Sequence, residues 1–198
     1  MLARALSRSK LVEAAELQRH VVAVQKRVLG ASHRDTLATM NHLALTLDDL
    51  HELAEAETLD REILKRQRET LGDSHPHVII SIGNLARVLH DLGKREEADE
   101  LFLEAIDGAE AGGIPTSATR LTFAQCLLAD ARLDDAETQL IAAEHELRTV
   151  EPDRRDRMQR VLALLVRIHR SRHDDERAES LERELRELER NPIGSAGR

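Results

Sequence analysis

The residues of this 198-residue chain whose types could do chemistry are ten histidines, one cysteine and many carboxylates. His75 and His77 flank Pro76, and His33 stands 42 residues before His75, a grouping that could suggest a metal site. A metal ion needs a full ligand set at a recognised spacing, and no cysteine or carboxylate cluster completes one. We therefore predict no metal and no cofactor, and interpret the histidines as linker residues and Pro76 as the start of a helix.

The other candidates for catalysis also have simpler interpretations. Cys126 has apolar neighbours in the sequence, which favours a buried core residue over a nucleophile. Gly112-Gly113 is not followed by the Gly-Lys-Ser/Thr of a phosphate loop. A run of carboxylates is interpreted as a solvated face, not as a catalytic pair: Asp48, Asp49, Glu52, Glu55 and Glu57. The sequence therefore predicts a protein that is not an enzyme; a hydrolase or transferase is the weakest alternative.

The elements that would position these residues form an internal repeat. Residues 29–59 align with residues 71–101 without a gap, at an offset of 42, with twelve identities in 31 positions. The alanine of the Glu55-Ala56 pair recurs as Ala98, Ala136 and Ala178, at offsets of 42, 38 and 42 along the chain. Repeats of 20 to 50 residues are typical of solenoids, in which each unit buries its apolar face against its neighbours.

Each unit has helical periodicity. Leu43, Leu47 and Leu50 recur at spacings of three and four, and a second apolar run follows a short polar stretch. Small residues such as Ala56 and Ala98 allow the two helices to approach closely. We predict an all-α, right-handed α-solenoid of antiparallel helix pairs that forms one domain over 1–190. It is divided into a half repeat at 10–29, repeats at 36–68, 78–107 and 117–147, and a degenerate repeat with a capping helix at 154–190. Residues 191–198 are expected to be a disordered tail.

These residues resemble a known family. Leu71-Gly72-x-x-His75-Pro76, Asn84-Leu85-Ala86, Leu92-Gly93 and Glu97-Ala98-Asp99-x-Leu101 look like the 42-residue tetratricopeptide repeat of kinesin light chains, which many bacterial proteins also carry. The resemblance implies a protein–protein interaction scaffold whose first helices line a concave groove. It departs from the family at Leu47, Leu53 and Asp60, where tyrosines are usual. Asn41 and Asn84 partly match the asparagines with which kinesin light chains bind cargo peptides, but the rest of that surface does not, so kinesin-type cargo binding is not implied.

Composition bounds the partners and the location. The formal net charge of −8 argues against general nucleic-acid binding. No segment approaches 18 uncharged apolar residues, so we predict no membrane span, and the absence of a recognisable signal peptide suggests a cytoplasmic protein. Only one cysteine is present, which excludes a disulfide framework.

The beginning of the chain suggests a second way of working. Residues 10–29 resemble a second helix without its first, so the apolar residues Val12, Ala15, Val22 and Val28 are expected to lack part of their cover. We expect either that the chain is the C-terminal part of a larger bacterial signalling or regulatory protein, or that it self-associates through this helix.

The resemblance also implies which side chains face a partner. Asparagine amides can bind a peptide backbone, and arginines can bind carboxylates. We therefore expect a protein or peptide partner, with an acidic segment favoured, in a groove formed by Asn41, His42, Leu45, Asp49, Asn84, Arg87, Asp91, Gln125, Arg160, Arg167 and Arg170. The alternatives are that these are ordinary polar helix surfaces, and that the chain is an oligomerisation module.

Overall fold

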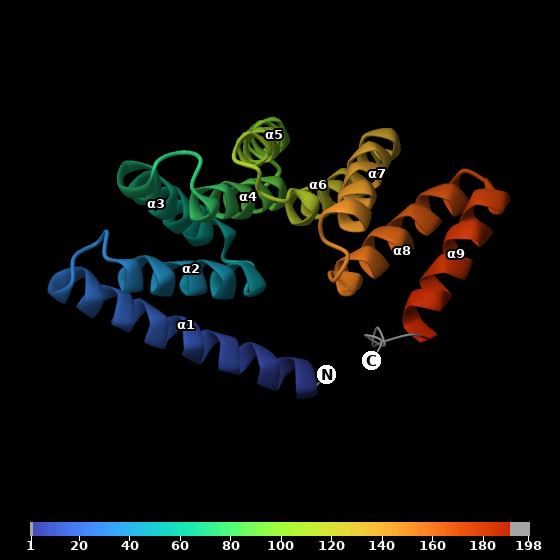
Figure 1. The fold of residues 1–198 in the computed structure, drawn as a ribbon. Coiled ribbons are helices and arrows are strands. Elements are labelled where there is room, and N and C mark those ends of the chain that lie inside the picture. The colour runs from blue at the N-terminus through green and yellow to red at the C-terminus, as the bar shows by residue number, and fades with distance from the viewer. Residues whose placement is uncertain (1, 191–198) are drawn as a thin grey trace, which may run out of the picture. The chain divides into compact units, whose positions relative to one another are not determined.

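The computed structural model describes residues 2–190, with the side chains described from residue 8 onward. Nine helices and no strand are found in these residues (Figure 1). Their bounds are α1 Leu2–Val28, α2 Arg34–Asp49, α3 Leu53–Leu71, α4 Pro76–Asp91, α5 Arg95–Ala111, α6 Ser117–Ala129, α7 Leu133–Thr149, α8 Arg155–Ser171 and α9 Asp175–Arg190. The predicted all-α fold of helix pairs is confirmed; the tail at 191–198 lies outside the described residues.

The helices form two compact units, Met1–Gly112 and Gly113–Arg198. In the first, α1 packs on α2, α2 on α3, α3 on α4 and α4 on α5; in the second, α6 packs on α7, α7 on α8 and α8 on α9. The boundary falls in the loop with Gly112, Gly113 and Pro115, where the 42-residue spacing shortens to 38. One unbroken domain over 1–190 therefore stays a prediction.

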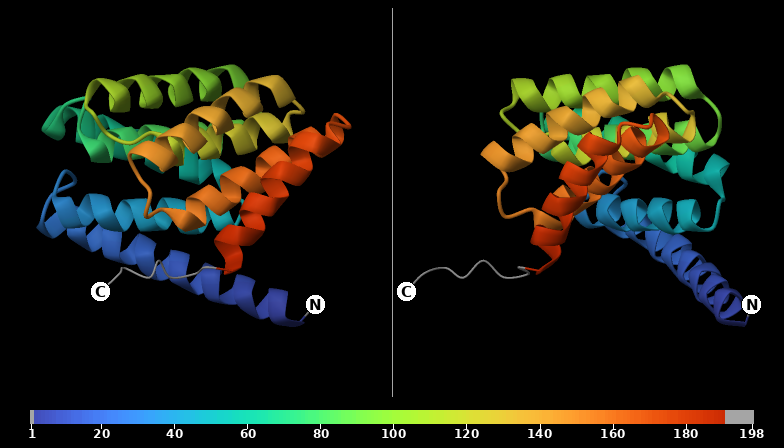
Figure 2. Two further views of the ribbon diagram at one scale, coloured as in Figure 1. Left: turned by 45° about the vertical axis from the view of Figure 1, so that its right-hand side comes forward. Right: turned by 90° about the vertical axis from the view of Figure 1, so that its right-hand side faces the viewer.

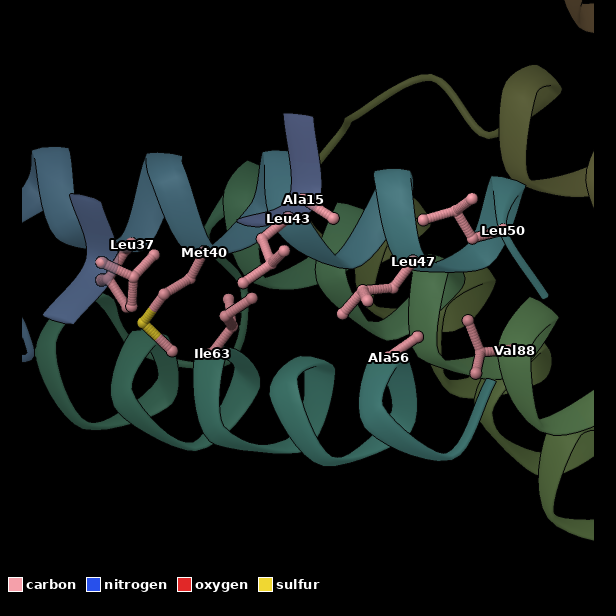
Figure 3. Packing of buried hydrophobic residues seen from close by; sticks show 10 residues of the cluster. Ala15, Leu37, Met40, Leu43, Leu47, Leu50, Ala56, Ile63 and Val88 are labelled. Carbon is pink, nitrogen blue, oxygen red and sulfur yellow. The ribbon is translucent and has the colours of Figure 1, made fainter. Parts of the chain in front are cut away.

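Apolar side chains at helical spacing build the core of the first unit. Leu37, Met40, Leu43 and Leu47 of α2 point towards Ala56 and Ile63 of α3 (Figure 3). Ala56 is fully buried, and a larger side chain there would push the two helices apart. Small residues thus set the distance between the two helices of a pair.

The histidines of the linkers are helix caps. Nδ1 of His33 accepts a hydrogen bond from the Asp35 N–H at 3.2 Å, and Nδ1 of His75 accepts one from the His77 N–H at 3.1 Å. Pro76 is the first residue of α4, where its missing N–H costs nothing. Both histidines satisfy an N–H that would otherwise lack a partner at a helix N-terminus, which accounts for their recurrence 42 residues apart.

Ion pairs between second helices repeat with the sequence period. Arg19 of α1 pairs with Glu55 of α3 at 2.7 Å, and 42 residues later Arg61 of α3 pairs with Glu97 of α5 at 2.6 Å. The hydrogen bond from Arg19 lowers the pKa of Glu55 below its usual value. The residue that corresponds to Arg19 and Arg61 on α5 is Leu103, which cannot bind a carboxylate. This series of ion pairs therefore ends at α5.

The turn inside each helix pair requires a left-handed backbone residue. Gly93 has φ = 79°, whereas the equivalent His51, Ala131 and His173 have φ = 60°, 59° and 58°. The left-handed conformation costs a residue with a Cβ about 1–2 kcal/mol. The chain therefore carries strain at three of its four turns, and glycine relieves it at only one of them.

Ala131→Gly is expected to raise the free energy of unfolding by about 1 kcal/mol, because glycine adopts this conformation without the steric cost. The measurement is urea unfolding followed by circular dichroism. Gly93→Ala is the reverse substitution and serves as the control. No atom lies within 4 Å of the added Cβ, so a decrease of about 1 kcal/mol in the free energy of unfolding would come from the backbone conformation and not from a clash. Equal stabilities for all three proteins would contradict the argument.

Candidate partner-binding surface

On the first helix of each pair, one stripe of side chains stays outside the core. In the first unit, the stripe of α2 contains His42, Leu45 and Asp49, and that of α4 contains Ile80, Asn84, Arg87 and Asp91. Each residue of the α4 stripe after Ile80 lies 42 positions beyond its counterpart on α2. The repeat register therefore places the predicted site residues of this unit on two equivalent helix faces.

Two exposed apolar side chains stand out on these faces. Leu45 is 44 % exposed and Ile80 is 57 % exposed, although both lie on well-ordered helices with buried opposite faces. Asn41 and Asn84 are half-buried, and no hydrogen bond joins either side-chain amide to another described residue. The surface thus combines apolar area with amide donors and acceptors that are available to a partner.

Charge on this surface is largely balanced. Arg87 of α4 forms an ion pair with Asp48 of α2 and lies 3.9 Å from Asp91. Arg87 therefore links α4 to α2 instead of presenting an unpaired positive charge. A partner binding here would meet a nearly neutral surface at Asp48 and Arg87, with Asp49 exposed at its end.

A buried carboxylate lies near this ion pair. Asp60 of α3 is only 3 % exposed. Burial raises the pKa of Asp60 from 3.8 to about 7; the Arg87 guanidinium opposes the rise and the Asp48 carboxylate adds to it. Asp60 stands where the repeats that this chain resembles usually have a tyrosine, but its burial follows only from the packing of α3 between α2 and α4.

The second unit presents a different surface. Gln125 of α6 and Arg160 and Arg167 of α8 are exposed, and none of the three side chains forms an ion pair or hydrogen bond with another described residue. Arg170, also predicted to face a partner, instead binds Asp175 at 2.6 Å and Glu182 at 3.1 Å on α9. Two of the three predicted arginines are therefore available to an acidic ligand, and one is already paired.

Hollows in the surface lie away from these stripes. One of about 660 Å³ opens between the α3–α4 linker, α4 and α5, with Ile79, Ile82 and Leu103 as its apolar part and carboxylates such as Asp107 at its edge. Sequence reasoning missed it. The available signal was Leu103, an apolar residue at the position where Arg19 and Arg61 form ion pairs.

Three further features concern the chemistry of the described residues: metal ligands, membrane-spanning helices and a free thiol. These residues contain no group of three or more His, Cys, Asp or Glu side chains placed to hold a metal ion. Among the described helices, none has both the length and the apolar character needed to cross a membrane. Cys126 is buried in α6.

Comparisons with known proteins agree with this architecture. A comparison with the curated proteins gives no match. Two crystal structures of a putative kinesin light chain from Podosopora anserina with nearly identical TPR-like repeats are 22 % identical, with TM-scores of 0.74 and 0.73; they cover 94 % and 98 % of this chain and 90 % and 93 % of their own. BtubC (BKLC) from P. vanneervenii is 17 % identical, with a TM-score of 0.75 over 96 % of this chain and 77 % of its own.

These likenesses concern the fold, and a family model concerns the sequence. The tetratricopeptide repeat model matches residues 1–35, 36–77 and 78–111, in three consecutive units. The two internal boundaries fall within the first turn of α2 and the first turn of α4, in the register of the helix pairs described above. Since the matches together cover more than half of the residues, the chain belongs to the tetratricopeptide repeat family, a class of helical repeats that generally serve protein–protein interaction.

Proposed function

We propose that this chain is a non-catalytic scaffold that binds an extended segment of a protein partner on the first helices of its pairs. The observation that carries the proposal is the pair of exposed apolar residues Leu45 and Ile80 beside the unpaired amides of Asn41 and Asn84. Apolar area supplies affinity, and the amides can bind the peptide backbone of a segment with little demand on its sequence.

An acidic character of the partner is supported by the second unit. Arg160 and Arg167 lie seven residues apart on α8, about two helical turns, so their guanidinium groups project from the same face. A charged side chain without an ion pair keeps its full capacity for a charge-assisted bond to a carboxylate. A segment with Asp or Glu would satisfy both arginines.

The test uses a random peptide library displayed on phage, selected on the wild-type chain. Selected peptides are expected to bind a Leu45→Glu/Ile80→Glu variant at least about tenfold more weakly. Binding would bury the two new carboxylates against apolar side chains of the peptide. Ile141→Glu, on the exposed surface of α7, is the matched control and should bind normally. Peptides that bind all three proteins equally would overturn the proposal.

A second selection, made on the Leu45→Glu/Ile80→Glu variant, tests the acidic segment on the second unit by itself. The peptides that it yields are expected to be rich in Asp and Glu, and to bind an Arg160→Glu/Arg167→Glu variant at least about tenfold more weakly than the wild type. Peptides without acidic residues would remove this part of the proposal and leave the scaffold intact.

Self-association is a second candidate function, favoured by one specific observation. Ala15 and Val22 of α1 are buried in the core that α1 shares with α2. Leu17 and Val28 are instead 65 % and 68 % exposed, and Val12 is also exposed. Incomplete cover is therefore found at Val12 and Val28, and the expectation was wrong for Ala15 and Val22, which α2 covers.

A further inference from the structure

The exposed face of α1 has the spacing of a coiled-coil seam. Ala14, Leu17, Val21, Val24 and Val28 follow one another at intervals of three, four, three and four residues, the a and d positions of a heptad. Leu17, Val24 and Val28 are exposed, and Ala14 and Val21 are half-buried. The neighbouring faces are occupied: Val22 packs in the core with α2, and Arg19 binds Glu55 of α3.

Part of this seam follows the repeat, and part does not. Positions 42 residues beyond Ala14, Leu17 and Val21 are the apolar Ala56, Leu59 and Ile63 of α3, whereas those beyond Val24 and Val28 are the polar Arg66 and Thr70. At the C-terminal end of the seam α1 is therefore apolar where α3 is polar. α1 is also long, with 27 residues or about 40 Å against 16 residues or about 24 Å for α2, and its N-terminal turns continue past the end of α2 (Figures 1 and 2).

Charges beside the seam identify what covers it. Glu13, His20 and Arg27 line one edge at seven-residue spacing, all are exposed, and none forms an ion pair with a described residue. If a second copy of α1 runs antiparallel, Leu17 meets Val21 of the second copy and Ala14 meets its Val24. The same alignment places Glu13 opposite Arg27 of the second copy, and two-fold symmetry makes this pair twice.

A parallel arrangement lacks this match. In parallel pairs the edge with Glu13 and His20 faces the opposite edge of the seam, where Gln18 and Gln25 stand. Neither glutamine offers a charge. We propose that α1 forms an antiparallel seam with α1 of a second copy, centred on Leu17 and Val21 and held in register by Glu13 and Arg27; this rests on the second proposed function and is independent of the peptide surface.

The experiment measures molar mass by light scattering across a concentration series up to about 1 mM. The wild-type chain is expected to form a dimer. Glu13→Arg and Arg27→Glu are each expected to weaken it roughly 10- to 30-fold, because each turns two attractions into repulsions. An equimolar mixture of the two variants should recover the wild-type affinity, since the heterodimer again pairs Arg with Glu at both ends. Glu16→Arg, exposed on α1 outside the seam, is the control for charge reversal.

Different failures have different meanings. A wild-type chain that stays monomeric overturns both the seam and self-association. A dimer that is insensitive to Glu13→Arg and Arg27→Glu, or whose mixed variants do not recover, overturns the antiparallel register only. Leu17→Lys should abolish the dimer while Ile141→Lys does not, and unchanged helicity by circular dichroism would show that Leu17→Lys acts on the seam; a dimer that survives Leu17→Lys contradicts the proposal.

Discussion

Asp60→Asn is expected to stabilise the first unit increasingly as the pH rises, by up to about 4 kcal/mol at pH 8. The carboxyl group of Asp60 is buried, and its pKa is raised from 3.8 to about 7. A shift of this size corresponds to about 4 kcal/mol, since one pKa unit is worth about 1.4 kcal/mol. Asparagine has nearly the same shape and does not ionise, so it removes the cost of burying the charge.

The direction of the pH dependence follows from proton linkage. Below about pH 4, Asp60 is protonated in the folded and the unfolded chain, and its contribution to stability is fully present. Between about pH 4 and pH 7 the unfolded chain releases the proton while the folded chain retains it, so stability falls until the folded pKa of Asp60 is passed. Arg87 of α4 opposes this loss and Asp48 of α2 adds to it.

Surface carboxylates act in a different pH range. The Lys94 ammonium lowers the pKa of Glu57, so the stability that Glu57 contributes is lost only as the pH falls below its usual range near 4.5. Between pH 5 and pH 8 such groups are ionised in both states.

The measurement is urea unfolding by circular dichroism at several pH values, because the chain has no Trp or Tyr to provide fluorescence. The difference between Asp60→Asn and wild type should be small at pH 4 and below, grow between about pH 4 and pH 7, and level off above pH 7. Glu69→Gln, at an exposed position of the same helix α3, is the control for removing a carboxylate at the surface. A flat difference for Asp60→Asn would contradict the raised pKa.

Features that depend on neighbours in sequence could be predicted. The repeat located the helix pairs, and the recurrence of His33 and His75 in the linkers indicated a structural role that is now seen as helix capping. Gly93 marked a turn whose backbone is left-handed in every pair. Each of these is decided within a few residues, so a periodic sequence is enough to find it.

Features that depend on distant elements could not. Arg170 looks like its neighbours Arg160 and Arg167 in sequence, but Asp175 and Glu182 of α9 neutralise it. Burial of Asp60 requires α3 to lie between two other helices. α1 begins at Leu2, whereas the sequence predicted a helix from residue 10. The prediction missed the first turns because they lack the apolar spacing by which it located helices.

Phe102→Ala is expected to lower the free energy of unfolding by about 3–5 kcal/mol. Phe102 of α5 is fully buried, and it stands 42 residues after Asp60, so the same position of the repeat holds a carboxyl group in one unit and an aromatic ring in the next. Removing a buried phenyl ring costs its transfer free energy and leaves a cavity. Whole domains are stable by only about 5–15 kcal/mol, so this one ring is a large share.

The loss of stability in Phe102→Ala should lie at the upper end of this range, because the neighbouring side chains cannot fill the cavity. The buried neighbours of Phe102 along α5 include Ala98, Ala105 and Ala109, whose short side chains cannot turn into the space. Phe102→Leu keeps most of the volume and should cost much less than Phe102→Ala in the same urea experiment. Leu103→Ala is the matched control: Leu103 is the next residue and is 48 % exposed, so its truncation should change stability by less than about 1 kcal/mol. Similar losses for Leu103→Ala and Phe102→Ala would mean that α5 is held by helix propensity and not by the ring at its buried face.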